Sequence, residues 1–496
     1  MKKNVLLLNT LMPLVLQVVS IVSGFILPRL IIEIYGSNIN GLISSITQYL
    51  GVISFMEMGV GSVIRFNLYK PLADKNNAQL SKVMSSAKKF YRRLAIILVF
   101  YVAFLIAFYP LIAEMKFDHL YTGILIASIS VSTFAQYFFG QVNQLLLSAD
   151  QKGYIHYTAQ VLTIIANTIV SVILIYVGLG IHEVKLASSV IYLLRPLFMQ
   201  WYVNKHYSID YKIKYDQEPI QQKWNGLVQH ISSVVLDSTD VIILTAMSTL
   251  ENVSIYSVYH MVVRSIKSLV SEMTYGIQTM MGKLFAENNM EELKSLFKWS
   301  EWIIHTGSVF VFGCTASLLI PFVKVYTAGI HDADYVQPLF AVLITLANAG
   351  HCLRLPYNLV ILAGGHYKQT QNNYIIATVV NIVLSVIMVH NLGLIGVAIG
   401  TLVAMMYQTI WMAWYISRNL LHCSMVDFVR QLLIDSVSFA VAFYLSSFVP
   451  LLSLSYLSWV VQAVIVALIW LAVVVVMNIV FYRSNINTLI KKMVRR

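Results

Sequence analysis

Charged residues are scarce in this sequence. Only 11% of the 496 residues are Asp, Glu, Lys or Arg, 58% are hydrophobic, and the mean hydropathy is +0.73. Soluble domains carry roughly 25% charged residues, and no water-soluble fold could cover so much apolar surface. The composition therefore predicts an integral membrane protein rather than a series of soluble domains.

Cysteine is also rare, and the common metal and nucleotide motifs are missing. Cys314, Cys352 and Cys423 are odd in number and too far apart for a CxxC pair, which argues against a disulfide framework, a zinc site or an iron–sulfur site. The sequence contains no HExxH motif and no phosphate-binding loop. We therefore expect no metal, no cofactor and no direct use of ATP.

Long apolar runs, in contrast, are plentiful. A membrane helix needs roughly 20 mostly apolar residues, and the first run lacks the cleavage site of a signal peptide. The sequence predicts an all-α polytopic membrane protein. About 14 transmembrane helices are expected, near residues 8–32, 40–64, 92–113, 121–147, 157–178, 184–203, 227–248, 253–281, 300–323, 336–361, 373–391, 394–415, 430–449 and 457–481.

Basic residues are unevenly distributed over the predicted loops. With a cytoplasmic N-terminus, 26 of the 34 Lys and Arg residues fall in cytoplasmic segments or tails. The positive-inside rule then predicts that both termini are cytoplasmic, and it explains the net charge of +12 without nucleic-acid binding. The longest polar stretches are too short for a catalytic domain, so an enzyme is not expected. These stretches are 66–91, 204–226, 282–299 and 482–496.

Two halves of the chain resemble each other at a spacing of about 215 residues: Glu57-Met58, for example, recurs as Glu272-Met273. Because six spans repeat as six, both copies enter the membrane in the same direction, which predicts two parallel six-helix repeats around a central cavity. This arrangement is typical of an alternating-access transporter. The predicted domains are an N-terminal six-helix lobe with its connecting cytoplasmic loop (1–226), a C-terminal six-helix lobe (227–423), and two additional helices with a cytoplasmic tail (424–496).

The predicted span 253–281 carries a polar stripe. At about 100° per residue, one narrow face holds Ser257, His260, Arg264, Lys267, Ser271, Tyr275 and Gln278. Polar side chains inside a membrane are costly and usually face a cavity or a polar partner. Two cations three residues apart favour a wet groove that binds an anionic part of the substrate. The alternative is a buried ion pair of Arg264 with Asp237 or Asp240 that only fixes helix packing.

Other polar residues inside the spans complete the candidate site. The remaining candidates for the cavity lining are Arg354, His351, Asn358, Gln17, Gln136 and Asn143, and the ion-coupling candidates are Asp240, Asp237, Glu57 and Glu272. Arg354 could instead snorkel or pair with a neighbour, and the two aspartates could instead be counter-ions of Arg264. Glu57 and Glu272 hold equivalent places in the repeat, where gating and helix capping or lobe packing explain them equally well.

Three stretches resemble a known transporter family. TDVIILTAMSTLENVSIYSVYHM is similar to the signature of spans 7 and 8 in polysaccharide and O-antigen flippases. SGFILPRLIIEIYGSNINGL resembles their first helix and outer loop, and LGLIGVAIGT resembles the glycine pattern of their twelfth helix. With the 6+6+2 arrangement, the resemblance covers nearly the whole chain. It points to the polysaccharide-transport branch of the multidrug/oligosaccharidyl-lipid/polysaccharide (MOP) exporter superfamily.

The resemblance implies a flippase of the bacterial cytoplasmic membrane that moves undecaprenyl-pyrophosphate-linked oligosaccharide, a polysaccharide repeat unit, across the bilayer. The implied partners are this lipid-linked glycan, membrane lipid, and the polysaccharide polymerase and glycosyltransferases, but no nucleic acid. Asp240 matches the family's aspartate in span 7. In the related lipid II flippases the first helix carries two arginines, whereas Arg29 stands alone here, which makes lipid II a doubtful substrate.

Three alternatives remain open at this point. A cation-coupled multidrug exporter of the same superfamily would carry organic cations, which Arg264, Lys267 and Arg354 would repel. A membrane polymerase or glycosyltransferase usually places its catalytic residues on a substantial outer loop, and the outer loops here are short. A scaffold role within a synthesis complex is the third possibility.

Overall fold

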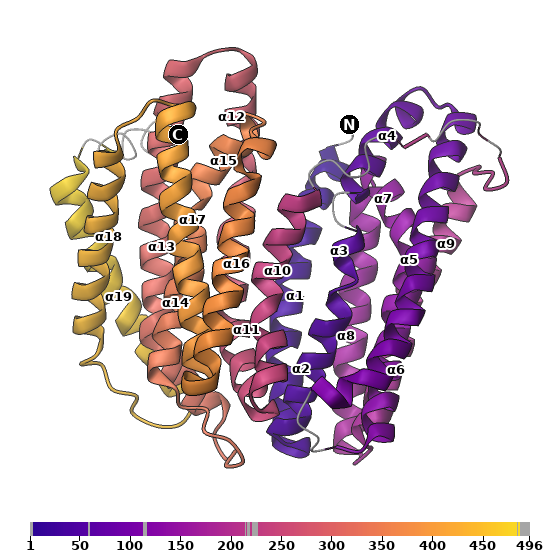
Figure 1. Ribbon diagram of the computed structural model, residues 1–496, viewed down its shortest axis with the longest axis horizontal. Coiled ribbons are helices and arrows are strands. Elements are labelled where there is room, and N and C mark those ends of the chain that lie inside the picture. The colour runs from indigo at the N-terminus through magenta and orange to yellow at the C-terminus, as the bar shows by residue number, and fades with distance from the viewer. Residues whose placement is uncertain are drawn as a thin grey trace. The chain divides into compact units, whose positions relative to one another are not determined.

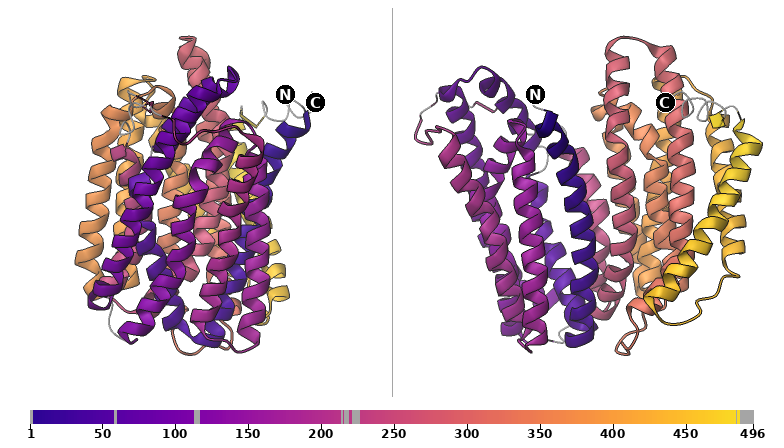
Figure 2. Two further views of the ribbon diagram at one scale, coloured as in Figure 1. Left: turned by 90° about the vertical axis from the view of Figure 1, so that its right-hand side faces the viewer. Right: turned by 180° about the vertical axis from the view of Figure 1, so that it is seen from behind.

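The computed structural model describes residues 3–57, 60–112, 117–213, 215, 219–220, 227–483 and 485–486, and within these ranges all regular secondary structure is helical. The helices form two compact units (Figures 1 and 2). The first unit comprises residues 1–234 and 248–254, and the second comprises 235–247 and 255–496. The predicted all-α polytopic architecture is confirmed. The domain boundaries expected at 226/227 and 423/424 stay predictions.

The first unit is a bundle in which α8 packs between α1 and α9, and α6 packs between α5 and α9. Its elements are α1 (Lys3–Tyr35), α2 (Ser37–Gly51), α3 (Ser54–Glu57), α4 (Val60–Ala73), α5 (Asn77–Ile112), α6 (His119–Ala135), the π-helix η1 (Gln136–Gly140), α7 (Gln141–Ala149), α8 (Gly153–Tyr176) and α9 (Ile181–His206).

The second unit is a larger bundle in which α17 packs against both α14 and α16. Its elements are α10 (Leu227–Met247) and α11 (Leu250–Met273), which begin in the first unit, then α12 (Tyr275–Ala286), α13 (Met290–Tyr326), α14 (Pro338–Leu353), α15 (Leu355–Ala363), α16 (Tyr367–Leu392), α17 (Leu394–Asn419), α18 (Met425–Ser446) and α19 (Tyr456–Phe481).

Within the described residues, ten helical segments are long and apolar enough to cross a membrane: α1, α5, α6 to α7, α8, α13, α14 to α15, α16, α17, α18 and α19. The other predicted spans are broken, such as α2 to α4, or carry several charges, such as α9 and α11. Large apolar side chains are exposed along the outside of the bundles, as expected where lipid is the solvent. The count of about 14 spans stays a prediction.

Two predicted spans are interrupted at matching places in the two halves. The π-helix that starts at Gln136 precedes by 215 residues the segment from His351, in which α14 ends and α15 begins. Broken helices with buried irregular backbone mark binding regions in many transporters. The repeat seen in the sequence therefore extends to the defects of its helices.

The last two helices pack on α13 of the second unit (Figure 2). The Trp470 ring of α19 fills the space above Gly313, where any added Cβ would overlap it. The Trp470 indole also donates a hydrogen bond to the Ser317 hydroxyl (3.1 Å), and the Trp302 indole donates to Asn478 (2.6 Å). The additional helices are thus joined to the second unit by both packing and buried polar contacts.

The polar stretches expected at 66–91 and 282–299 are largely extensions of helices rather than loops. The 36 residues of α5 and the 37 of α13 correspond to about 55 Å at 1.5 Å per residue. A hydrocarbon core is only about 30 Å thick. Both helices therefore extend beyond the membrane at the end that carries their polar residues.

Candidate functional site

The residues His260, Arg264 and Lys267 of the predicted cationic stripe lie on α11. Arg264 is exposed, and His260 and Lys267 are partly buried. The helix stops at Met273 and resumes at Tyr275, so the stripe does not continue as one straight ridge to Gln278. The side chain of Tyr275 lies outside the described part of the chain.

A narrow crevice within the second unit collects four of the predicted site residues. Asp240 of α10, His260 and Lys267 of α11, and His351 of α14 all line it. The other lining residues come from the same helices and α17: Leu236, Tyr256, Ile344, Ala347, Asn348, Ala398, Thr401 and Met405. The enclosed volume is about 20 Å³, which holds a single water molecule or small ion but no larger group.

Asp240 forms the polar centre of this crevice. The carboxylate is 5% exposed and accepts a hydrogen bond from the Tyr256 hydroxyl (2.8 Å). The Thr401 hydroxyl lies 3.0 and 2.9 Å from its two oxygens, and Asn381 donates to that hydroxyl (3.0 Å). A carboxylate that accepts hydrogen bonds from hydroxyl groups in a space of this size can bind a proton or a small cation.

The ion pair between Arg264 and Asp240, one alternative left open by the sequence, is not among the contacts of the described residues. Asp237 lies on α10, and its side chain is outside the described part of the chain. Arg264 therefore does not serve as the structural counter-ion of Asp240. The exposure of its guanidinium leaves it accessible to a ligand.

The three candidates near the end of α14 form a separate cluster. Arg354 is buried, and its guanidinium lies 3.0 Å from His351 Nδ1 and over the ring of Tyr374. The Tyr374 hydroxyl donates to Asn358 (2.8 Å). His351 thus connects this cluster to the crevice, while Arg354 and Asn358 face α16.

Two candidates in the first unit, Gln136 and Glu57, belong to a hydrogen-bonded chain. Gln136, at the start of the π-helix, donates to Gln141 (2.9 Å), and Gln141 donates in turn to Glu57. The Tyr91 hydroxyl also donates to Glu57 (3.1 Å). Asn143 is buried and donates to Phe139 O and Gln200. Glu57 and Asn143 therefore both form hydrogen bonds that stabilise local packing in the first unit.

Two further candidates, Gln17 and Glu272, lie on α1 and α11. Gln17 is partly buried on α1, and Glu272 is exposed at the last turn of α11. Although Glu57 and Glu272 are equivalent in the repeat, only Glu57 is held by a network of described hydrogen bonds. No three His, Cys, Asp or Glu side chains among the described residues are grouped to hold a metal ion.

Sequence reasoning missed Tyr256, Thr401 and Asn381, which hold Asp240 and its hydroxyl partner. Hydroxyls and amides are common in membrane helices, so residue type alone does not separate a site residue from a packing residue. One signal was available: Thr401 ends the glycine-rich stretch LGLIGVAIGT. Gly396 and Gly400 leave no room for a side chain against α16, and this close approach brings Thr401 to Asn381.

Comparison with known proteins detects similarity at the level of structure only. No family model matches the sequence, and no curated protein is similar to it. The structure is similar to that of lipid II flippase MurJ in an inward closed conformation, with a TM-score of 0.70 and 15% sequence identity. That match covers 97% of this chain and 100% of the flippase.

Multidrug transporters have the same fold. The MATE multidrug transporter DinF-BH gives a TM-score of 0.62 at 13% identity, covering 84% of this chain and 97% of that one. An inward-facing MATE transporter of the MOP superfamily gives 0.56 at 16% identity, covering 82% and 94%. The chain therefore has the fold of MOP-superfamily transporters, as the resemblance of its sequence implies.

Proposed function

We propose that this protein is an alternating-access flippase that translocates undecaprenyl-pyrophosphate-linked oligosaccharide across the bacterial cytoplasmic membrane. The observation that carries the proposal is the extent of the structural match to a flippase. The similarity to MurJ runs over 97% of the chain, whereas the MATE matches end at 82–84%. A fold shared over nearly the full length favours a flippase over a drug exporter.

The charge of the α11 stripe supports an anionic cargo. A diester pyrophosphate carries two negative charges at neutral pH, and Arg264 and Lys267 supply two positive charges on adjacent turns of one helix. An arginine can engage phosphate oxygens through two N–H groups, while a lysine acts as a point charge. The crevice beside Lys267 is too small for a pyrophosphate, so binding requires a conformation in which this region is open.

Asp240 is the proposed coupling residue. Its carboxylate lies in the same crevice as Lys267, so a proton or small cation on Asp240 would lower the local negative charge and change the field at the cationic stripe. Asp237, Glu57 and Glu272 remain further coupling candidates. Polysaccharide polymerase and glycosyltransferases of the same pathway are the proposed protein partners, and both chain termini are proposed to be cytoplasmic.

Single substitutions test the role of the stripe. Loss of one charge-assisted contact costs about 1.5–3 kcal/mol, so Arg264→Ala should reduce substrate affinity roughly ten- to a hundredfold. Arg264→Lys should recover part of the loss, and protein abundance should not change. Lys283→Ala is the control, because Lys283 is an exposed cation of the same unit outside the stripe. Wild-type transport by a well-expressed Arg264→Ala, Lys267→Ala double variant would refute the role of the stripe.

A cation-coupled multidrug exporter is the second candidate function. The match to the MATE multidrug transporter DinF-BH favours it, because the TM-score of 0.62 is not far below the 0.70 of the flippase. Under this hypothesis Asp240 would contact the cationic cargo, and removing Arg264 should improve drug export rather than impair it. The sign of the Arg264→Ala effect therefore separates the two functions.

A further inference from the structure

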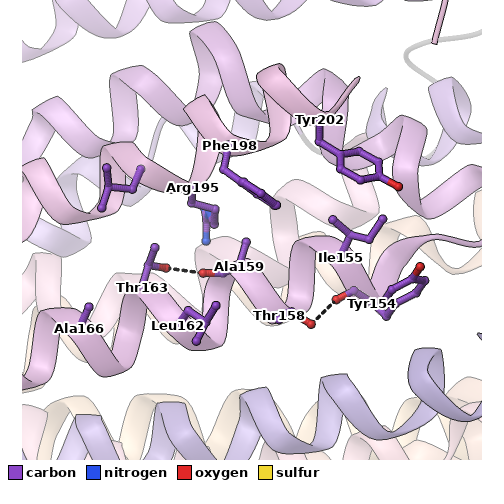
Figure 3. Close-up of a pocket in the computed structure, with 11 residues that line it drawn as sticks. Tyr154, Ile155, Thr158, Ala159, Leu162, Thr163, Ala166, Arg195, Phe198 and Tyr202 are labelled. Atoms are coloured by element: carbon purple, nitrogen blue, oxygen red, sulfur yellow. Dashed lines mark hydrogen bonds between the residues drawn. The ribbon is translucent and has the colours of Figure 1, made fainter. Parts of the chain in front are cut away.

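A large groove lies within the first unit, beside the hydrogen-bonded chain that contains Gln136. It has a volume of about 580 Å³, within the range of small-molecule sites, and lies between α8 and α9 (Figure 3). Its lining consists of Tyr154, Ile155, Thr158, Ala159, Leu162, Thr163, Ala166, Leu194, Arg195, Phe198 and Tyr202. All of these residues belong to one unit, so the groove is formed by this bundle alone.

The groove has the surface expected for a hydrocarbon chain. On α8, Ala159 and Ala166 are small and leave the space between the helices open. The rim is apolar and accessible: Leu162 is 62% exposed, Leu194 57% and Phe198 41%. Burial of each methylene against such a surface is worth about 0.8 kcal/mol relative to water, but lipid already supplies that environment. Hydrocarbon contact alone therefore makes no specific site.

Arg195 provides the specific feature. Its side chain extends from α9 toward Ala159 of α8 (Figure 3). Its Nη2 donates to the neutral amide oxygen of Gln136 (2.7 Å), and its Nε is buried without a hydrogen-bond partner. Among the described residues no carboxylate lies within ion-pair distance of it.

The carboxylate of Glu57 is linked to Arg195 only indirectly, through a chain of hydrogen bonds. Gln136 donates to Gln141, and Gln141 donates to Glu57, so two amides separate the cation from this anion. A guanidinium with an unsatisfied N–H in apolar surroundings is costly unless an anion compensates it. The open side of the groove is the direction from which such an anion can come.

The depth of Arg195 suits a lipid headgroup. Tyr154 and Tyr202 line the end of the groove where α8 begins and α9 approaches its end, and tyrosines of this kind gather at the membrane interface. Arg195 precedes Tyr202 by seven residues, or about 10 Å along the helix. A lipid phosphate drawn inward along the groove from this interface can therefore meet the guanidinium.

We infer that the α8–α9 groove binds one anionic phospholipid of the surrounding bilayer, with its phosphate on Arg195 and an acyl chain along Leu162, Leu194 and Phe198. Charge complementarity selects the lipid, and the apolar walls orient it. This site is independent of the cargo that the protein transports. Its occupation would compensate the charge of the Arg195 guanidinium and hold α8 against α9.

Native mass spectrometry of the full-length protein in detergent tests the inference by titration with phosphatidylglycerol and with phosphatidylethanolamine. The wild type should bind one phosphatidylglycerol in preference to phosphatidylethanolamine. Arg195→Gln should bind phosphatidylglycerol about ten- to a hundredfold more weakly, as expected for loss of a charge-assisted contact. Lys205→Gln is the matched control, because Lys205 is an exposed cation near the same end of α9 that does not line the groove.

A second variant removes the space and keeps the charge. Ala159→Leu places a larger side chain in the groove and should also abolish preferential phosphatidylglycerol binding. This variant decides the question if Arg195→Gln fails to fold, as judged by its elution profile. Equal binding of the two lipids by the wild type, or unchanged binding by Ala159→Leu, would overturn the inference. Preferential retention of a polyprenyl pyrophosphate over phosphatidylglycerol in the groove would overturn it as well.

Discussion

A buried contact between a histidine and an aspartate joins α18 to the rest of the second unit and gives the most quantitative stability prediction. His305 of α13 is fully buried, and its Nδ1 lies 2.7 Å from Oδ2 of Asp435 on α18. Gln431 donates to the other carboxylate oxygen (3.0 Å). On the opposite side of the imidazole, the Tyr357 hydroxyl lies 3.4 Å from Nε2 and donates to Glu301 (2.6 Å). Every polar atom of the Asp435 carboxylate is therefore engaged inside the bundle.

Removal of one partner should be far more harmful than removal of both. Asp435→Ala leaves the imidazole beside Glu301 without its carboxylate, and breaking a buried pair in this way costs about 3–5 kcal/mol. The double variant His305→Leu, Asp435→Leu replaces the pair by apolar side chains, and such replacements are often neutral or stabilising by about 1–4 kcal/mol. The single variant should thus be destabilised and the double variant should recover.

Denaturation of the purified protein in mixed micelles, followed by tryptophan fluorescence, measures both free energies of unfolding. Asp427→Ala serves as the control, because this residue lies on the same helix but forms only an exposed 3.7 Å contact with Lys298, worth no more than about 1 kcal/mol. An Asp435→Ala variant as stable as the wild type would refute the reasoning. A double variant as unstable as the single one would refute it equally.

Three further predictions concern packing, reactivity and topology. Gly313→Leu should destabilise the second unit by more than about 1–3 kcal/mol, because the new side chain overlaps the Trp470 ring. Gly307→Leu on the same helix is the control, because open space surrounds Gly307, and it should lower the free energy of unfolding only slightly in the same assay. Burial raises the pKa of the Cys423 thiol, so less thiolate is present at pH 8. In a variant whose other two cysteines are alanine, alkylation of Cys423 should therefore be slower than alkylation of a free thiol. Equal rates would contradict this prediction. A cysteine placed at Lys75, in the turn between α4 and α5, should react with a membrane-impermeant reagent only from the cytoplasmic side, and labelling from outside would reverse the proposed topology.

Much of the architecture follows from the sequence because hydrophobic length and internal repetition are properties of the chain itself. Apolar runs predict the membrane helices, and the spacing of 215 residues seen in the sequence reappears between the π-helix at Gln136 and the segment from His351 in which α14 ends. Pro356 in the first turn of α15 is a visible cause of one break. The π-helix at Gln136 has no proline to reveal it. Its position follows from packing that a single sequence does not encode locally.

Only part of the candidate site could be predicted, because the sequence shows the periodicity of one helix but not its packing against the next. Helical periodicity places His260, Arg264 and Lys267 on one face of α11, but it does not give the rotation of that face toward α10. That rotation decides that Lys267 lines the crevice of Asp240 while Arg264 is exposed. Arg195 was not singled out, because one arginine in a span has no periodic partner. Its significance appears only when α8 and α9 are brought together.

Direct flipping by the purified protein is the measurement closest to the central proposal. One set of proteoliposomes would contain a fluorescent undecaprenyl-pyrophosphate-linked oligosaccharide, and a second set would contain a cationic dye. A membrane-impermeant quencher or lectin would report the lipid that crosses the bilayer. We predict protein-dependent crossing of the lipid-linked glycan, reduced about ten- to a hundredfold in affinity by Arg264→Ala, and no transport of the dye. Transport of the dye without any crossing of the lipid-linked glycan would contradict the flippase assignment.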